Sequence, residues 1–435
     1  MERINAQCPV TIDGFDFVEE SGGIFEYRLA SNGLQVLLLP QPVVPVVAFM
    51  VTYRVGSRNE VTGLTGATHM LEHLMFKGTE KFNRKLNNSV FNVLQSVGAQ
   101  VNATTWYDRT NYYELLPKDY LPLAIEIEAD RMRGALINEE DLESERTVIL
   151  NEFDRGKNDP VRNLYDSVWS TAFVAHPYHH PTIGWRSDIE NATVKGLRHF
   201  YDTYYRPDNA TVSVLGDFEP EASLELIRQH FGGITNPSEP IPDVTTREPE
   251  QNGERRVTVR QAGQVGSLML AFKSPPGLDR DVEALDVLAM VLSTGKNSRL
   301  FSRLTDKGLT TNVGATASRL RDPGLFYLFA FLTPGTEHEI VEEEIWNALE
   351  EIKDKGITEA ELRRAKNQLR AQEIFGRDGV FAVASQLNEA IAAGDWKLYT
   401  AYLDRIAAVD VESVQRVAKT YCVRDRSTVG RYIPS

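Results

Sequence analysis

Two histidines and a glutamate lie close together in the segment HMLEH, residues 69–73. The pattern of residues around this segment predicts a helix over residues 65–77. Positions i, i+3 and i+4 share one face of a helix, so His69, Glu72 and His73 are expected to project from the same side. Two neutral imidazoles in this arrangement can bind one zinc ion, and the carboxylate beside them can reach a water molecule at the open coordination position.

The order His-x-x-Glu-His is that of inverted zinc-peptidase motifs. The alternative interpretation is that both histidines are surface or core residues of an amphipathic helix. A catalytic zinc ion normally has three protein ligands, so His69 and His73 require a third partner elsewhere in the chain.

A second predicted helix, residues 139–157, offers candidates for the third ligand. Glu145 and Glu152 are two helical turns apart and share a face, on which we also expect the apolar Val148 and Ile149. Glutamate is seldom buried beside apolar residues unless it is paired or bound to a metal ion, which favours Glu152 as a ligand. Three other acids of this segment are interpreted as a solvated cluster: Glu139, Glu140 and Glu143.

The elements that must position these residues follow the same rough order twice along the chain. In each half, apolar strand-like runs precede a helical segment and then two alternating strand-like stretches. The first half has them at residues 34–55, 65–77 and 97–117, and the second at 265–275, 282–293 and 312–334. Further helices are predicted at 118–137 and at 358–372, where Thr358 and Glu361 form a capping box.

A proline-rich stretch, residues 232–256, has almost no apolar periodicity and indicates a linker. We therefore expect an N-terminal domain at residues 1–231 and a homologous C-terminal domain at 257–435. Strands followed by helices in each half favour two α+β domains. The second half has no histidine in its stretch corresponding to the zinc helix, and it is expected to be inactive.

Composition excludes several classes of function. The 435 residues carry a net charge of −14 without a basic run, which argues against nucleic acid as a partner. No apolar stretch is long enough to span a bilayer, and the N-terminus lacks a signal-peptide pattern. A cytoplasmic location is the default expectation, and a periplasmic one applies if a signal was removed. Cys8 and Cys422 stand at opposite ends of the chain, so histidines and carboxylates must hold any metal ion.

Five segments together resemble the pitrilysin/insulinase family of zinc metallopeptidases. The resemblance spans essentially the whole chain and is strongest to the half-length branch, which includes the mitochondrial processing peptidase subunits and small bacterial relatives. It implies two homologous domains, each a mainly antiparallel sheet packed with helices, that form half of a clamshell chamber. The segments are GLTGATHMLEHLMFKGT (63–79), VNATTWYDRTNYYELLP (101–117), ERTVILNEF (145–153), HPYHHPTIGW (176–185) and FYDTYYRPDNATVSVLGD (200–217).

The resemblance implies one zinc ion per chain, with His69, His73 and Glu152 as its ligands. It also implies that Glu72 is the general base and that Glu145 is a supporting second acid. The function expected from this site is a zinc-dependent endopeptidase or oligopeptidase that hydrolyses peptides or unfolded segments in a closed chamber. The alternative is a non-catalytic core or assembly subunit of the same fold.

Members of this family bind the peptide as an added strand, and Asn102-Ala103 matches the residue pair that they use. Backbone hydrogen bonds would then hold an extended peptide largely independently of its sequence. A turn or capping role for Asn102 is the alternative interpretation.

Active members also supply an arginine and a tyrosine from the second half, and this chain has Thr305 and Thr311 at those positions. We therefore predict a heterodimer with a homologous subunit that carries the Arg-Tyr pair and lacks the zinc motif. A homodimer is possible, and in either case Arg299 or Arg303 is the nearby alternative source of a cation.

Overall fold

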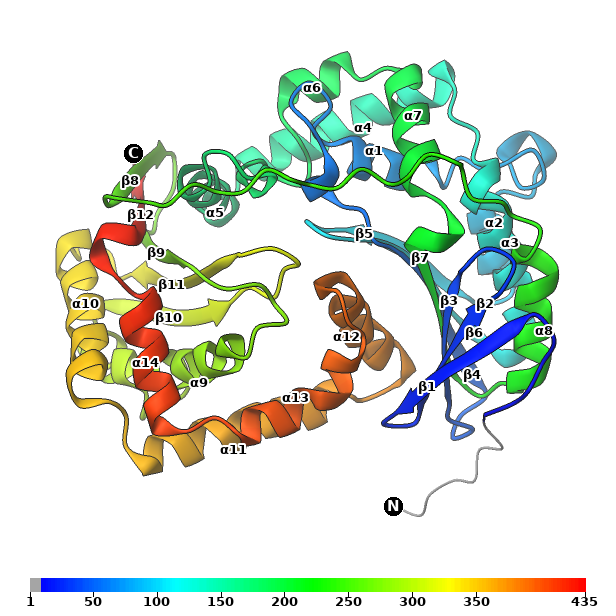
Figure 1. Ribbon diagram of the computed structural model, residues 1–435. Coiled ribbons are helices and arrows are strands. Elements are labelled where there is room, and N and C mark those ends of the chain that lie inside the picture. Colours follow the sequence, from blue (N-terminus) through cyan, green and yellow to red (C-terminus); the bar gives the residue numbers. More distant parts are fainter. Residues whose placement is uncertain (1–8) are drawn as a thin grey trace. The chain divides into compact units, whose positions relative to one another are not determined.

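The computed structural model describes residues 9–435, and its elements are labelled in Figure 1. Cys8 lies outside the described residues. The chain folds into two compact units. Unit 1 contains residues up to 151 together with 182–244 and 377–392, and unit 2 contains 152–181, 245–376 and 393–435. Each unit includes a segment from the other half of the chain. The predicted domains, 1–231 and 257–435, therefore remain a proposal.

Unit 1 is built on a seven-stranded sheet with the order β1-β2-β3-β7-β4-β6-β5. Neighbouring strands are antiparallel except for β3 and β7, which are parallel. β5 forms one edge of the sheet, and the interior strand β4 is buried along almost its whole length. The strands are β1 Phe15–Ser21, β2 Ile24–Leu29, β3 Gln35–Pro40, β4 Val46–Tyr53, β5 Gln100–Thr105, β6 Thr110–Pro117 and β7 Ala210–Gly216.

Helices surround this sheet, and one of them comes from the C-terminal part of the chain. They are α1 Ala67–Leu74, α2 Val90–Ser96, α3 Leu121–Gly134, α4 Glu139–Lys157, α6 Arg186–Asn191, α7 Val194–Tyr204, α8 Pro220–Phe231 and α12 Val380–Ala393. The boundary between the units passes through α4, between Asn151 and Glu152. This single continuous helix therefore carries both Glu145 and Glu152.

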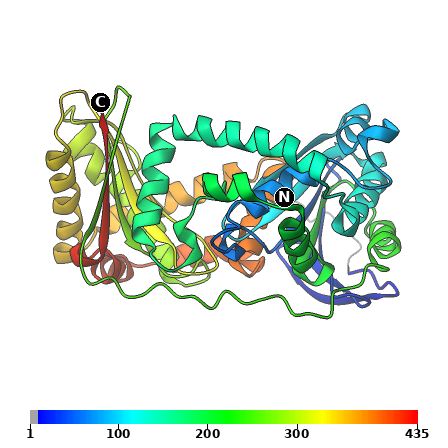
Figure 2. The same cartoon turned by 90° about the horizontal axis from the view of Figure 1, so that it is seen from above.

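Unit 2 has a five-stranded sheet with the order β10-β11-β9-β12-β8, in which only β12 and β8 are parallel. α5 packs on one face of the sheet, whereas α9, α10 and α14 bury the other face (Figure 2). The strands are β8 Arg255–Gln261, β9 Ser267–Lys273, β10 Thr310–Ala317, β11 Leu325–Leu332 and β12 Ser427–Pro434. The helices are α5 Pro160–Ala172, α9 Asp281–Ser293, α10 His338–Lys355, α11 Glu359–Gly376, α13 Lys397–Ala407 and α14 Val411–Tyr421.

The structure confirms the predicted α+β class, with a mainly antiparallel sheet in each unit. Residues 232–254 contain no helix or strand, and β8 begins at Arg255, within the stretch 232–256 that the sequence indicated as a linker. Thr358 and Glu361 exchange the two hydrogen bonds of a capping box at the start of α11. Within the described part of the chain, none of the helices combines the length and the apolar character that crossing a bilayer requires.

Two predicted helices are shorter in the structure than their sequence patterns indicated. The helix predicted over 65–77 is α1, which begins after Gly66, because that residue has a positive φ of 83° that does not continue a right-handed helix. The helix predicted over 118–137 begins with a short 3-10 turn at Lys118–Tyr120, continues as α3 and ends at Gly134.

Candidate metal centre

One face of α1 is buried, and the other face carries the three polar residues of the motif. Met70, Leu71 and Leu74 are at most 1% exposed, whereas both histidines of the motif and Glu72 are half-buried. The i, i+3, i+4 spacing explains this division, because the apolar side chains occupy the opposite face of the same two turns. The predicted arrangement of His69, Glu72 and His73 on one side of a helix is therefore present.

A buried carboxylate holds the N-terminus of α1. Glu60 is 3% exposed and accepts hydrogen bonds from the backbone N–H groups of Gly66, at 2.7 Å, and Thr68, at 2.8 Å. Both donors belong to the first turn, where helical N–H groups have no partner within the helix. Burial raises the pKa of Glu60 to about 7, although the two backbone hydrogen bonds oppose this shift.

The loop before α1 is held by a second acid and by a close approach of two backbones. Asp188 accepts hydrogen bonds from the backbone of Gly63 and from both the backbone and the hydroxyl of Thr65. A Cβ at Gly66 would lie 2.4 Å from the carbonyl oxygen of Ile183, and one at Gly184 would lie 2.5 Å from that of Thr65. Only glycine fits at these two positions, and this allows the backbones around Gly66 and Gly184 to pack directly against each other.

The two histidines of α1 and Glu152 of α4 converge. Each offers one ligand atom, and these atoms all lie within 4.8 Å of one another. Two imidazole nitrogens and one carboxylate oxygen form a donor set typical of catalytic zinc, which keeps a fourth position open. Among the described residues, this is the one group of three or more His, Cys, Asp or Glu side chains arranged to hold a metal ion. The residues present therefore fit zinc.

Glu145 contacts one of the two histidines rather than the cluster itself. Its Oε2 lies 2.8 Å from Nδ1 of His73, and its other oxygen forms an ion pair with Lys77. The hydrogen bond with His73, together with Lys77, lowers the pKa of Glu145 to about 2, so its carboxylate is ionised and can only accept. Nδ1 of His73 must then carry the proton, and the lone pair of Nε2 is left for a metal ion.

Glu72 is hydrogen-bonded to the edge strand of the sheet. The hydroxyl of Thr105, the last residue of β5, donates to Oε2 of Glu72 at 2.5 Å. Successive residues of a strand point to opposite faces, so Ala103 lies on the same face as Thr105 and Asn102 on the other. Ala103 is 5% exposed and Asn102 is exposed. The structure thus places Asn102-Ala103 on the strand that also orients Glu72.

Four residues around this centre were not predicted from the sequence. Spacing along the chain could have indicated two of them, Lys77 and Thr105. Lys77 follows His73 by four positions and shares its face, and Thr105 follows Ala103 by two on one strand face. Glu60 and Asp188 had no such signal, because Glu60 bonds to backbone N–H groups and the partners of Asp188 lie 123 to 125 positions away.

One expectation about α4 was wrong. Val148 is 46% exposed, because it lies about 60° around the helix from Glu145, on the side that turns toward solvent. Ile149 is 1% exposed and belongs to the buried stripe. Glu139 and Glu140 are exposed, and the exposed Glu143 forms an ion pair with Arg146, as expected of a solvated cluster.

In unit 2, both threonines at the expected Arg-Tyr positions bond locally. Thr305 Oγ1 lies 3.0 Å from Thr310 Oγ1, and Thr311 donates to a backbone carbonyl of β11. Arg299 forms ion pairs with Glu361 of α11 and Glu351 of α10. Arg303 forms ion pairs with Glu344 and Glu351, both on α10. Each arginine is therefore engaged with carboxylates of its own unit.

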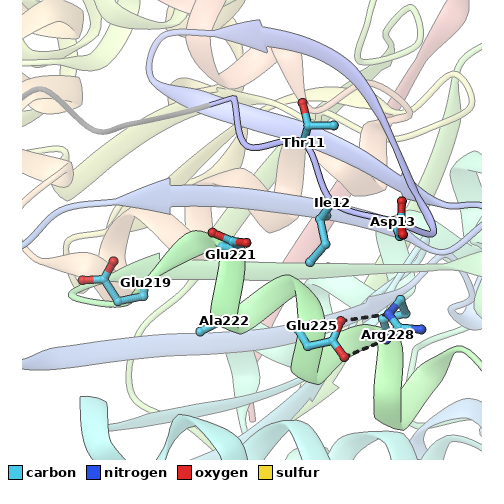
Figure 3. Close-up of a pocket in the computed structure, with 8 residues that line it drawn as sticks. All are labelled: Thr11, Ile12, Asp13, Glu219, Glu221, Ala222, Glu225 and Arg228. Carbon is cyan, nitrogen blue, oxygen red and sulfur yellow. Dashed lines mark hydrogen bonds and ion pairs between the residues drawn. The ribbon is translucent and has the colours of Figure 1, made fainter.

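A surface pocket of about 780 Å³ occupies another part of unit 1 (Figure 3). Residues 11–13, Glu219 and one side of α8 line it, and Glu225 and Arg228 form an ion pair there. Neither α1 nor α4 contributes to this pocket, so it is separate from the metal centre.

Comparisons with known proteins show similarity to one family along most of the chain. The sequence model described as insulinase (peptidase family M16) matches residues 35–185, and the one described as peptidase M16 inactive domain matches residues 191–369. The zinc protease PqqE of Helicobacter pylori is 34% identical over 403 residues, which cover 91% of this chain and 90% of that protein.

Two solved structures show the same fold. The crystal structure of a protease from Helicobacter pylori has a TM-score of 0.87 and 33% identity, and the match covers 93% of this chain and 98% of that one. The periplasmic protease PqqL from Escherichia coli has a TM-score of 0.79 at 18% identity, over 97% of this chain and 48% of PqqL. With both sequence models matched in order and a relative of 34% identity along nearly its whole length, the chain belongs to peptidase family M16, the insulinase family.

Proposed function

We propose that the protein is a zinc-dependent peptidase subunit that hydrolyses peptides or unfolded segments. His69, His73 and Glu152 would hold one zinc ion, and Glu72 would act as the general base. The observation that carries the proposal is the convergence of these three ligand atoms within 4.8 Å beside Glu72. Relatives named zinc proteases support the same activity.

The chemistry divides between the metal and the side chains around it. A zinc ion bound here would polarise the scissile carbonyl and lower the pKa of its bound water toward neutrality. Glu72 would take a proton from the attacking water and deliver it to the leaving amine. The hydrogen bond from Thr105 orients the Glu72 carboxylate, and Glu145 holds the His73 ring in the tautomer that can bind metal.

The edge strand β5 supplies a site for the peptide. β5 pairs with β6 on one side and ends the sheet on the other, so an extended peptide can add to it as a further strand. Backbone groups of alternate residues face the free edge, so one of Asn102 and Ala103 would form the backbone hydrogen bonds to the peptide. The peptide carbonyl would then lie near Glu72, because Thr105 connects the same strand to that residue.

The subunit would act with a homologous partner that completes a chamber and supplies the Arg-Tyr pair. Thr305 and Thr311 carry no charge, and Arg299 and Arg303 are engaged with acids of α10 and α11. The match to PqqL covers almost all of this chain and about half of PqqL, as expected where two such halves are joined in one longer protein. A heterodimer would combine one zinc site with one Arg-Tyr pair.

Zinc content and peptide cleavage, measured on the same preparation, test this function. We expect one zinc ion per chain after dialysis and cleavage of an unstructured, fluorescence-quenched peptide in the presence of the partner. Removal of zinc with a chelator should abolish cleavage, and added zinc should restore it. A chain that binds no zinc, or one that cleaves nothing with or without a homologous partner, would instead be an assembly subunit of the same fold.

A further inference from the structure

A polar network crosses three strands of unit 1 and ends at the edge strand. Thr52 on β4, Asn111 on β6 and Thr104 on β5 are successive cross-strand neighbours. The hydroxyl of Thr104 donates to Oδ1 of Asn111 at 2.6 Å. Thr52 and Asn111 are at most 2% exposed, so this network lies inside the protein except at its β5 end. Hydrogen-bonded polar groups in such surroundings hold their neighbours in one arrangement.

α12 closes the network from the C-terminal part of the chain. Asn388, which is 3% exposed, accepts a hydrogen bond from Thr52 at 2.7 Å and donates one to Asn111 at 3.2 Å. The ring of Phe381 packs against Tyr113 of β6, with centroids 4.5 Å apart. These contacts explain why residues 377–392 belong to unit 1 although α11 and α13 on either side belong to unit 2.

Arg109, in the turn between β5 and β6, ties the edge strand to this helix. Its guanidinium donates to the hydroxyl of Thr104 at 2.6 Å and more weakly to the carbonyl of that residue at 3.3 Å. It also donates to Oδ1 of Asn111 at 2.8 Å and to Glu389 of α12 at 2.9 Å. The Arg109 side chain is 11% exposed, so these charge-assisted bonds are partly shielded from water.

We infer that Arg109, together with Glu389, is a positioning residue that fixes β5 for peptide binding. Thr104 faces the network, and the alternation along the strand turns its neighbours Ala103 and Thr105 to the other face, where Thr105 meets Glu72. An edge strand has strand neighbours on one side only, so bonds from side chains must supply the rigidity that a second strand would otherwise give. A strand that is already ordered binds a peptide with less loss of conformational freedom.

This inference rests on the proposed function for its peptide-binding consequence, and kinetics of the zinc-loaded full chain with its partner test that consequence. Loss of a charge-assisted hydrogen bond typically costs enough to change binding about tenfold. In Arg109→Ala we expect KM for the quenched peptide to rise by about tenfold while kcat stays within about twofold and zinc is retained. Glu389→Gln, which removes only a charge from a half-exposed side chain, should raise KM less and in the same direction.

Two further variants show whether the effect belongs to this contact. Arg133→Ala is the matched control, because Arg133 pairs with Asp202 in the same unit and touches no residue of β5 in the bonds it forms. It should leave KM unchanged. The double variant Arg109→Ala/Glu389→Gln should be no worse than Arg109→Ala alone, because the two changes remove one shared interaction.

Hydrogen exchange of the peptide-free chain tests the positioning itself without any catalysis. We expect the protected amides of residues 100–105 to exchange about tenfold faster in Arg109→Ala than in the wild type, and α3 to exchange as before. Unchanged exchange in β5 would overturn the inference, and so would an unchanged KM in a folded, zinc-loaded Arg109→Ala. If the wild type cleaves no peptide, the proposed function fails, but the exchange result still decides whether Arg109 orders β5.

Discussion

At the scale of single residues, the proposed metal centre involves two acids of α4, Glu145 and Glu152. Glu152 offers its carboxylate to the cluster, and Glu145 bonds to the far nitrogen of His73. Both lie on α4, two turns apart, so their different roles follow from where α1 places the two histidines. Acids that act on the metal directly and acids that act through a ligand should respond differently to substitution.

Glu152→Gln should lose zinc, because the amide replaces the one anionic ligand of the set. Glu143→Gln is the matched control on the same helix, since Glu143 is exposed and forms its ion pair with Arg146. Zinc stoichiometry by mass spectrometry after dialysis distinguishes the two. An empty site in Glu143→Gln together with a full one in Glu152→Gln would show that the ligand is assigned to the wrong acid.

Glu145→Gln should weaken zinc binding without abolishing it. Substitutions that remove the hydrogen-bond partner of a ligating histidine typically cost about 10- to 100-fold in metal affinity. Here the variant would also remove the carboxylate partner of Lys77, whose side chain is 8% exposed beside the site. Competition with a chromophoric chelator measures the change, and an affinity equal to that of the wild type would remove Glu145 from the support of His73.

At the scale of elements, α1 is placed by contacts at its N-terminus, and these make its anchoring sensitive to pH. The pKa of Glu60 is raised by burial from 4.5 to about 7. Between these values the folded state holds a proton that the unfolded state has released. The free energy of unfolding therefore falls as pH rises through this window, and the loss from this group is complete above about pH 7.

Glu60→Gln should remove this pH dependence. Wild type is expected to lose up to about 3 kcal/mol more than the variant between about pH 5 and about pH 8, because each pKa unit corresponds to about 1.4 kcal/mol. Urea unfolding of both proteins in the presence of a chelator measures the difference, since zinc binding would add its own pH dependence. Parallel curves for the two proteins would contradict the assignment.

The elements themselves could be predicted to a large extent, but not their long-range contacts. Apolar periodicity located α4 at residues 139–157 and the pair of strands within 97–117, because local spacing alone decides which face is apolar. The docking of α12 on unit 1 was not predictable in this way. Asn388 and Thr52 are 336 positions apart, and neither carries a local pattern that indicates the other. Glu60 was not predictable for a different reason, because its partners Gly66 and Thr68 are near in sequence but bond through their backbone N–H groups.

At the scale of the whole molecule, the two halves of the chain differ in what they can offer to catalysis. α1 in unit 1 carries His69, Glu72 and His73, whereas α9, the helix of unit 2 that follows β8 and β9, is mainly apolar and has no histidine. Thr305 and Thr311 cannot supply a positive charge to a developing oxyanion. Removal of such a donor typically costs about 10²- to 10³-fold in rate, which is why we propose that another subunit supplies the pair.

The chain alone should therefore be a poor peptidase, and a homologous subunit with the Arg-Tyr pair should raise kcat/KM by about 10²-fold or more. Purified chain is measured alone and after mixing with such a paralogue from the same source. A paralogue whose Arg and Tyr are replaced by Thr is the control, because it tests the pair rather than assembly. Full activity of the isolated chain, unchanged by the paralogue, would exclude the partner requirement.

Substitution of Glu72 separates metal binding from catalysis in one measurement. Glu72→Gln keeps the shape of the side chain and can still bond to Thr105, but the amide cannot take a proton from water. Zinc content and cleavage of the quenched peptide are measured together, on the wild type and the variant, each with its partner subunit. We expect one zinc ion per chain in both proteins and cleavage only by the wild type. Cleavage by zinc-loaded Glu72→Gln at the wild-type rate would contradict the proposed mechanism.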